Sequence, residues 1–174
     1  MTATSLRRSR GPAGRHRRRL VVAGATAGAL LLALTAPAGA AGEPDPTFSG
    51  DGRVTVDLTN DGYEGGYAAA VQPDGRVLAA GRTGGSGGRM YVARFNADGS
   101  PDTTFSGDGV AEVDFGPGDD WGTDIALGAD GTIVVAGSAG NYAKMALARF
   151  TSAGSLDLTF SGDGRRTFNM SPGE

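Results

Sequence analysis

Carboxylates in loops are the main candidates for chemistry in this sequence. Hard cations such as Ca²⁺ bind several oxygen ligands gathered in loops, and Asp–Gly pairs are frequent here. The seven such pairs begin at Asp51, Asp61, Asp74, Asp98, Asp108, Asp130 and Asp163. Asp51, Asp108 and Asp163 are the best metal candidates because they occupy one position of a repeated motif. Repetition suits a structural Asx-turn equally well, so both interpretations stay open.

A second candidate site surrounds Trp121, the only tryptophan. Asp119, Asp120 and Asp124 lie beside it in the sequence. Acidic groups next to an exposed aromatic ring suit a carbohydrate or a cationic ligand. Tyr67 lies in the corresponding acidic part of the preceding repeat, which predicts an acidic, aromatic loop on one face. We expect these five residues to bind a protein or glycan ligand.

The composition excludes several kinds of chemistry. The sequence has no Cys, which excludes disulfides, a thiol nucleophile and a Cys zinc site. The only histidine is His16, so His-dependent catalysis is excluded for residues 41–174. Those residues carry nine basic side chains against all 19 acidic ones, a net charge of −10, which disfavours nucleic acid as a partner. We expect no catalytic residues, and calcium is the only cofactor left open.

Residues 1–40 have the organisation of a secretory signal peptide. Seven arginines and no acidic residue precede or flank an apolar run at 20–35, and Ala38-Gly39-Ala40 offers small residues for cleavage. Arg17-Arg18 also resembles a twin-arginine signal, so Sec and twin-arginine export are alternatives. The apolar run of 16 residues is shorter than the roughly 20 needed to span a bilayer. We expect a secreted, extracellular protein with no membrane span after cleavage.

An octapeptide occurs three times in the remainder of the chain. Residues 45–52 (DPTFSGDG) return as 102–109 (DTTFSGDG) and 157–164 (DLTFSGDG), so the phenylalanines are 57 and 55 residues apart. Two further pairs of blocks share this spacing: 73–81 (PDGRVLAAG) with 129–137 (ADGTIVVAG), and 90–95 (MYVARF) with 145–150 (MALARF). A fixed period of this kind indicates a chain built from stacked supersecondary units.

Each repeat predicts four short strands. Apolar residues alternate with polar ones after each octapeptide, the pattern of a strand with one buried face. The expected strands are residues 53–58 and 111–115, 67–71 and 123–127, 77–80 and 133–136, and 90–95 and 145–150. Asp-Gly at 74–75 and 130–131 predicts type I′ hairpin turns. No sustained helical period follows residue 40.

Two residue types recur at positions suited to structural roles. Arg94 and Arg149 occupy the same place in an A-R-F frame. Met90 and Val92 share the strand face of Arg94, so we expect this arginine to pair with a repeat aspartate. The octapeptide phenylalanines are interpreted as plugs between strands or blades: Phe48, Phe105 and Phe160. The glycine-rich residues 83–89 join two expected strands and precede no helix, which argues against a phosphate-binding loop.

These blocks resemble the delta-60 repeat family of bacterial β-propellers, whose members share D-x-T-F-x-G-D-G, P-D-G-[KR]-[IV]-x-x-A-G and x-x-A-R-[FY]-x-x-x-G-x-x-D motifs. The resemblance covers residues 45–168. It implies a propeller fold and an exported protein, with no established activity and no catalytic residues. The leading interpretation is a non-catalytic module for binding or surface scaffolding. The alternatives are a metal-dependent propeller hydrolase or a calcium-stabilised adhesion repeat.

The expected fold is all-β, with two four-stranded antiparallel blades of β-propeller type plus an extra strand, after an N-terminal signal helix. The expected boundaries are 1–40 for the signal peptide, 41–52 for a linker with the first motif, 53–115 and 116–170 for the blades, and 171–174 for a tail. Propellers usually need four to eight blades to close. Two blades therefore indicate a piece of a longer product, a ring completed by further copies of the chain, or an open pair of sheets.

Overall fold

The computed structural model describes residues 42–58 and 63–169. These residues belong to one compact unit of the chain, Ala38–Glu174. The predicted signal peptide with its helix (1–40), the predicted tail (171–174) and Asp61 lie outside the described residues.

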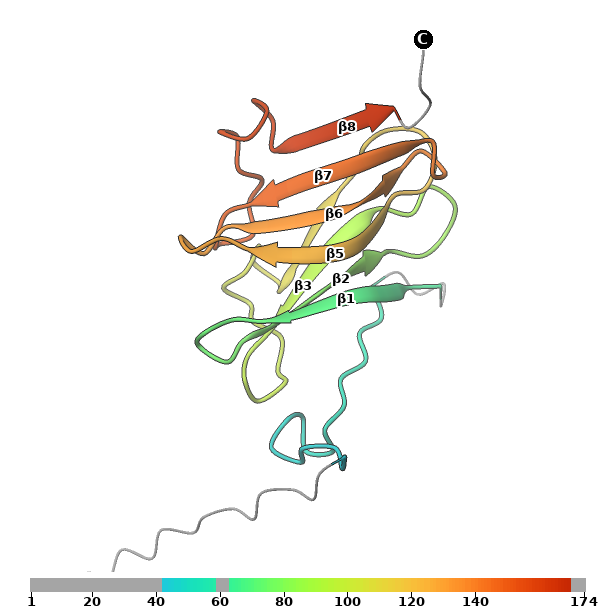
Figure 1. The fold of residues 1–174 in the computed structure, drawn as a ribbon. Coiled ribbons are helices and arrows are strands. Elements are labelled where there is room, and N and C mark those ends of the chain that lie inside the picture. Colours follow the sequence, from blue (N-terminus) through green and yellow to red (C-terminus); the bar gives the residue numbers. More distant parts are fainter. Residues whose placement is uncertain (1–41, 59–62, 170–174) are drawn as a thin grey trace, which may run out of the picture. The chain divides into compact units, whose positions relative to one another are not determined.

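The described residues form two four-stranded antiparallel sheets, one for each predicted blade (Figure 1). In blade 1 the strand order is β1-β2-β3-β4, and in blade 2 it is β5-β6-β7-β8. The strands are β1 (Gly65–Val71), β2 (Val77–Arg82), β3 (Met90–Phe95), β4 (Val110–Val113), β5 (Trp121–Leu127), β6 (Ile133–Ala139), β7 (Lys144–Phe150) and β8 (Arg165–Asn169). No helix occurs within these residues, and the predicted all-β fold is confirmed.

The two Asp-Gly hairpins correct one prediction, because they are not type I′ turns. Gly75 has φ +85°, whereas Asp74 is not among the residues with positive φ. The Gly75 N–H donates to the Gln72 carbonyl at 2.9 Å, which closes a type I turn followed by a left-handed glycine. The length of the loop explains the difference, because three residues separate the hydrogen-bonded Gln72 and Arg76. A three-residue hairpin loop is typically a type I turn followed by a left-handed residue. In the second hairpin the Gly131 N–H donates to the Gly128 carbonyl in the same way.

The predicted extra strand is also corrected, because residues 53–58 are extended but form no strand. After the other two octapeptides, the equivalent stretch pairs with the third strand of its own blade, as Ala93 with Val110. Residues 53–58 have no such edge within the described part of the chain. Val54 and Leu58 instead pack against the cluster of Tyr91, Ala93 and Phe95 on the outer side of blade 1.

The main core lies between the two blades. We call the side of each blade that faces earlier residues its upstream face and the other side its downstream face. The downstream face of blade 1 packs against the upstream face of blade 2, and β5 contacts β1, β2 and β3 across the interface. The buried residues include Leu78, Ala80, Met90, Val92, Ala111 and Val113 from blade 1, and Ile133, Val135, Ala146, Ala148 and Phe150 from blade 2.

The alternation in β3 explains how blade 1 contributes to two cores. Met90 and Val92 face blade 2, whereas Tyr91, Ala93 and Phe95 form a separate cluster on the upstream face. Residues 48–58 run over this second cluster. Successive side chains of a strand point to opposite faces, so one short apolar strand serves both interfaces.

Phe105 fills the interblade core, whereas its counterpart in the last octapeptide is only half-buried. Phe105 is completely buried in the main cluster. Phe160 occupies the same motif position, and no further sheet covers it within the described residues.

Removing the Phe105 ring will therefore destabilise the protein much more than removing the Phe160 ring. We expect Phe105→Ala to lower the free energy of unfolding by about 3–5 kcal/mol, because it opens a cavity in a closed core. Phe160→Ala should cost about 1–2 kcal/mol, since part of that ring already contacts solvent. Urea unfolding followed by circular dichroism measures both changes, and equal losses would contradict this packing.

Candidate functional site

The Trp121 region is a cluster of three loops at the joint between the blades. Residues 83–89 connect β2 to β3, residues 114–120 connect blade 1 to blade 2, and residues 140–143 connect β6 to β7. Backbone hydrogen bonds join all three: the Asp120 N–H donates to the Gly88 carbonyl at 2.8 Å, and the Asn141 N–H donates to the Asp119 carbonyl at 3.0 Å. We call this the joint cluster.

Asp120 is a structural residue of the joint cluster. Its side chain is buried, with one carboxylate oxygen accepting the Phe115 N–H at 2.9 Å and the other accepting the Gly140 N–H at 3.1 Å. Burial raises the pKa of Asp120 above its ordinary value, although these two hydrogen bonds oppose the shift. A carboxylate enclosed in this way ties two loops together and does not face a ligand.

Asp119 binds the glycine-rich loop of blade 1. Its Oδ1 accepts the N–H groups of Gly87 and Gly88 at 2.8 and 2.9 Å, and its Oδ2 forms an ion pair with Arg82 at 3.0 Å. The hydrogen bond from Arg82 is the largest cause that lowers the pKa of Asp119, and the two backbone N–H groups add to it. The backbone donors that a phosphate would need are therefore occupied by a carboxylate of the chain itself.

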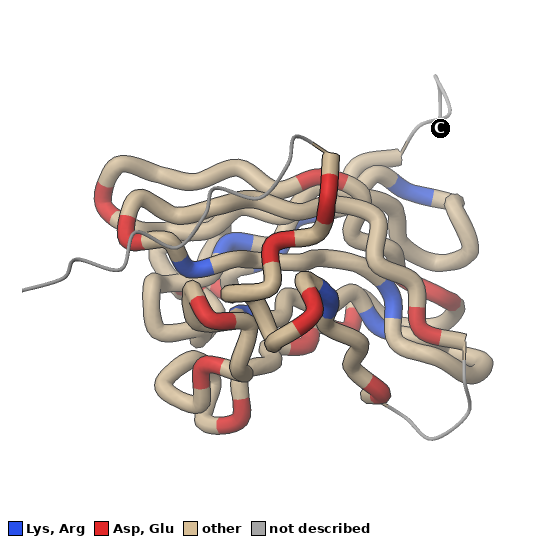
Figure 2. The backbone as a smooth tube through the Cα atoms, turned by 90° about the horizontal axis from the view of Figure 1, so that it is seen from below, with Lys and Arg blue, Asp and Glu red and all other residues tan. Residues whose placement is uncertain are grey.

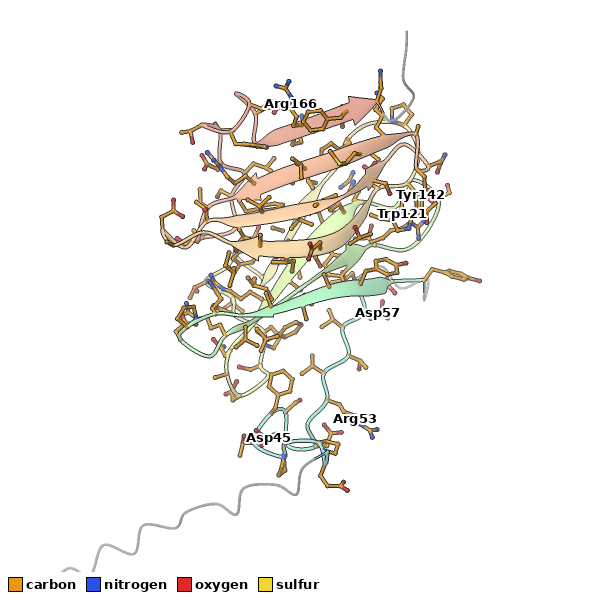
Figure 3. All side chains as sticks on the ribbon, in the orientation of Figure 1. Asp45, Arg53, Asp57, Trp121, Tyr142 and Arg166 are labelled. Carbon is orange, nitrogen blue, oxygen red and sulfur yellow. The ribbon has the colours of Figure 1, made fainter. Side chains whose placement is uncertain are left out.

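Trp121 stacks on an aromatic residue that the sequence analysis missed. The Trp121 and Tyr142 ring centroids are 3.9 Å apart, with planes inclined by 14° (Figure 3). The Arg82 guanidinium lies 5.6 Å from the Trp121 ring, and it also donates to the Gly85 carbonyl. Tyr142 is 67 % exposed. Tyr142 has no counterpart in the first repeat, where the equivalent loop is longer, so no repeat pattern singles it out.

Three of the predicted binding residues lie on strands: Trp121 begins β5 next to the joint loops, whereas Tyr67 and Asp124 lie further along their strands. Tyr67 and Asp124 are exposed residues of β1 and β5, at or next to the bulge in each strand. The strand registers make Gly65 the counterpart of Trp121, because Gly65 pairs with Arg82 as Trp121 pairs with Ser138. This corrects the expectation that Tyr67 marks the equivalent loop in the first repeat.

The three metal candidates each close a turn within their own octapeptide. Asp51, Asp108 and Asp163 accept the backbone N–H two residues further on, in every case at 2.9 Å. This is the Asx-turn that the sequence left as the alternative. Among the described residues, no group of three or more His, Cys, Asp or Glu side chains is placed to hold a metal ion.

The repeated arginines connect the third strand of each blade to the octapeptide that follows it. Arg94 Nε lies 2.8 Å from Asp102 Oδ2, and its guanidinium lies 4.6 Å from the Phe105 ring. Thr104 also donates to Asp102, and its hydroxyl is the largest cause that lowers the pKa of that carboxyl. Arg149 makes the corresponding ion pair with Asp157, also at 2.8 Å.

Charged residues are distributed over the described surface without a basic stripe. Figure 2 shows Asp and Glu spread along the turns, with Lys and Arg interspersed among them. No helix of the described residues is long and apolar enough to cross a membrane.

Comparison with known families identifies the type of repeat. Residues 72–105 and 128–160 match the model of a β-propeller domain of unknown function (DUF5122). Each match begins next to an Asp-Gly hairpin and ends at the octapeptide phenylalanine, so it includes the second and third strands of one blade. The chain therefore carries two repeats of β-propeller type. No curated protein matches the sequence.

The ion pair and hydrogen bonds of Asp119 predict how acid weakens the joint cluster. Because the folded pKa of Asp119 is lowered, its contribution to stability is full above the unfolded value of 3.8 and is lost as the pH falls through the folded pKa. Asp120 acts in the opposite sense, since its folded pKa is raised. We expect Asp119→Asn to be less stable than the wild type at pH 7, with a smaller difference at pH 3.

Thermal melting of both proteins between pH 7 and pH 3 checks this prediction. A melting-temperature difference that is the same at every pH would contradict the role given to the Asp119 charge. Asp120→Asn is the useful comparison, because the folded pKa of Asp120 is raised. As the pH falls from 7 to 3, the melting-temperature difference between this variant and the wild type should change in the opposite direction.

Proposed function

We propose that this chain of two β-propeller repeats is an exported, non-catalytic binding module, and that Tyr142 backed by Trp121 is its ligand platform. The observation that carries the proposal is an exposed aromatic ring held in place at a conformational cost. Asn141 and Tyr142 have φ values of +58° and +67°, and Gly140 before them has +64°. A left-handed conformation of a residue other than glycine costs of order 1–3 kcal/mol, and such strain gathers at functional sites.

The surroundings of Tyr142 support a preorganised platform. The Asp119 N–H donates to the Asn141 side-chain oxygen at 3.0 Å, and the Asn141 N–H donates back to the Asp119 carbonyl at the same distance. Asp120 holds the Gly140 N–H from the buried side. A loop fixed before binding loses little conformational entropy when the ligand arrives, which favours affinity.

The chemistry of this platform favours a glycan over a cation. The two acidic groups nearest to the rings are engaged inside the joint cluster, Asp119 with Arg82 and Asp120 with backbone N–H groups. What remains outward is the Tyr142 ring beside the exposed Asn141. An apolar ring face next to a polar amide suits the alternating apolar and hydroxyl faces of a sugar.

The proposed ligand contact can be measured through Trp121, because it is the only tryptophan. Titration with soluble cello-, chito- and manno-oligosaccharides should change the Trp121 fluorescence for at least one class. Tyr142→Ala should weaken that binding at least about tenfold, a loss of roughly 1.4 kcal/mol, because the stacking surface is removed.

Tyr63→Ala provides the matched control, since Tyr63 is also an exposed tyrosine but lies outside the joint cluster. It should bind as the wild type does. The proposal that the ligand platform binds a glycan is wrong if no oligosaccharide changes the Trp121 fluorescence. It is also wrong if the Tyr142→Ala and Tyr63→Ala variants bind the oligosaccharide equally well.

The export part of the proposal rests on residues 1–40. Their arginine cluster, apolar run and Ala38-Gly39-Ala40 sequence support cleavage after Ala40. We expect mass spectrometry of protein recovered from the culture medium to give a chain that begins at Ala41. Arg17→Lys combined with Arg18→Lys should block export if the twin-arginine route is used and should leave Sec export intact. Recovery of the chain only inside cells, with Met1 present, would contradict export.

A further inference from the structure

The downstream face of blade 2 exposes the residues that blade 1 buries at the same positions. Met90 pairs with Val113 in blade 1, and Met145 pairs with Phe168 in blade 2. The first pair is buried beneath blade 2, whereas Met145 and Phe168 are each 39 % exposed. Leu147 and Val134 are likewise less buried than their counterparts Val92 and Leu78. The chain therefore presents a second copy of its interblade surface without a described partner on it.

The repeated arginines show the same difference. Arg94 is 4 % exposed, and its Nη1 donates across the interface to the Ser152 carbonyl of blade 2 at 2.6 Å. Arg149 is 29 % exposed, although it keeps the local arrangement, with an ion pair to Asp157 and the Phe160 ring at 5.0 Å. Within the described residues, no carbonyl takes the place that Ser152 has for Arg94.

The octapeptides reveal how one blade engages the next. The Ser106 N–H donates to the Ala153 carbonyl of blade 2 at 2.8 Å, and the Ser49 N–H donates to the equivalent Asp98 carbonyl of blade 1 at 2.7 Å. Ser161 has φ +57°, against +55° for both Ser49 and Ser106. Its N–H has the same orientation in its motif but meets no such carbonyl in the described part of the chain.

The loops that receive the octapeptides are shaped as sockets. A Cβ added at Gly154 would lie 2.9 Å from the Ser106 nitrogen, and one added at Gly99 would lie 2.9 Å from the Ser49 nitrogen. Glycine at these two positions therefore permits the close approach of an octapeptide from the preceding repeat. Blade 1 and blade 2 each carry one socket, at residues 96–99 and 151–154.

We propose that the downstream face of blade 2 binds the upstream face of blade 1 of a second copy of this chain. The octapeptide 157–164 of the first copy then occupies the socket 96–99 of the second copy. Ser161 donates to the Asp98 carbonyl there, and Arg149 acquires an acceptor equivalent to Ser152. The contact repeats the interface that already joins the two blades within one chain.

Residues 45–58 act as an exchangeable cap on the socket and face that this contact uses. The cap forms no strand, and Val56 within it is 38 % exposed. A groove of about 240 Å³ remains between the cap and blade 1, lined by Phe48, Val54 and Tyr91 among others. The apolar surface of a whole blade would cover this face more completely than a single extended segment does.

Arg166 is the main departure from the buried version of the interface. It stands where blade 1 has Ala111, because Val92 pairs with Ala111 as Leu147 pairs with Arg166. Its guanidinium lies 5.4 Å from the Phe168 ring, on the outermost strand. A long side chain at this edge can lay its apolar stem on the interface and keep its charge in water.

The predicted contact is head-to-tail, because two different faces meet. Such contacts produce closed rings when the rotation between copies closes and open chains when it does not. The mass of the assembly therefore shows whether the copies close into a ring. Loss of the assembly when the downstream face of blade 2 is mutated shows that this face makes the contact.

Sedimentation velocity of the exported protein over a hundredfold concentration range tests the proposal. We expect species larger than a monomer that increase with concentration. Phe168→Asp should leave a monomer throughout, because it places a charge in the contact. Thr167→Asp is the matched control, since Thr167 is an exposed neighbour on the same strand that points to the opposite face. It should assemble as the wild type does.

A cap variant completes the test. Phe48→Ala weakens the competing segment without altering the downstream face of blade 2, so it should shift assembly to at least about threefold lower protein concentration. Circular dichroism melts confirm that each variant is folded. A monomer for both the wild type and Phe48→Ala at every concentration, or assembly that survives Phe168→Asp, would overturn the proposal.

Discussion

Both faces of blade 1 are apolar, and this constraint governs the rest of the structure. An antiparallel sheet with two apolar faces is stable only when other elements cover both of them. Blade 2 covers the downstream face of blade 1, beginning with β5, and residues 48–58 cover its upstream face. Three features hold the successive sheets in place: the close approach of the backbone at the glycines, the phenylalanines of the octapeptides, and the contacts of the repeated arginines.

The octapeptide combines two tasks that are usually divided between a turn and an interface. Its first aspartate, as at Asp102, holds the strand arginine, and its phenylalanine enters the interblade core. Its last aspartate, as at Asp108, closes the turn that leads into the outer strand. Because strand pairing and blade stacking depend on the same few residues, the motif is retained almost unchanged in all three copies.

Features encoded by a repeated local pattern could be predicted from the sequence. The strand at Met90–Phe95 has the bounds of the repeated block, and its two faces separate as expected. Residues 53–58 alternate apolar and polar residues as a strand would, but they lack the neighbouring edge that makes such a segment a strand. The turn type at Asp74 and Asp130 follows from the three-residue length of both loops, which depends on where the flanking strands pair and not on the Asp-Gly signal. Two acidic residues near Trp121 suggested a charged site, but burial and ion pairing, which depend on the tertiary fold, direct them inward. Tyr142 occurs in one repeat only and so carried no pattern.

Each repeat contains its own plug and its own socket, and this has a consequence for how such a protein can change length. Phe105 and Ser106 fit the loop at Gly154, and Ser49 approaches the loop at Gly99. A duplicated segment of one period would therefore bring both complementary parts with it and would fit its neighbours without further substitutions. The joint loops at 83–89 and 140–143 differ in length between the two repeats, so they can diverge while the units remain interchangeable.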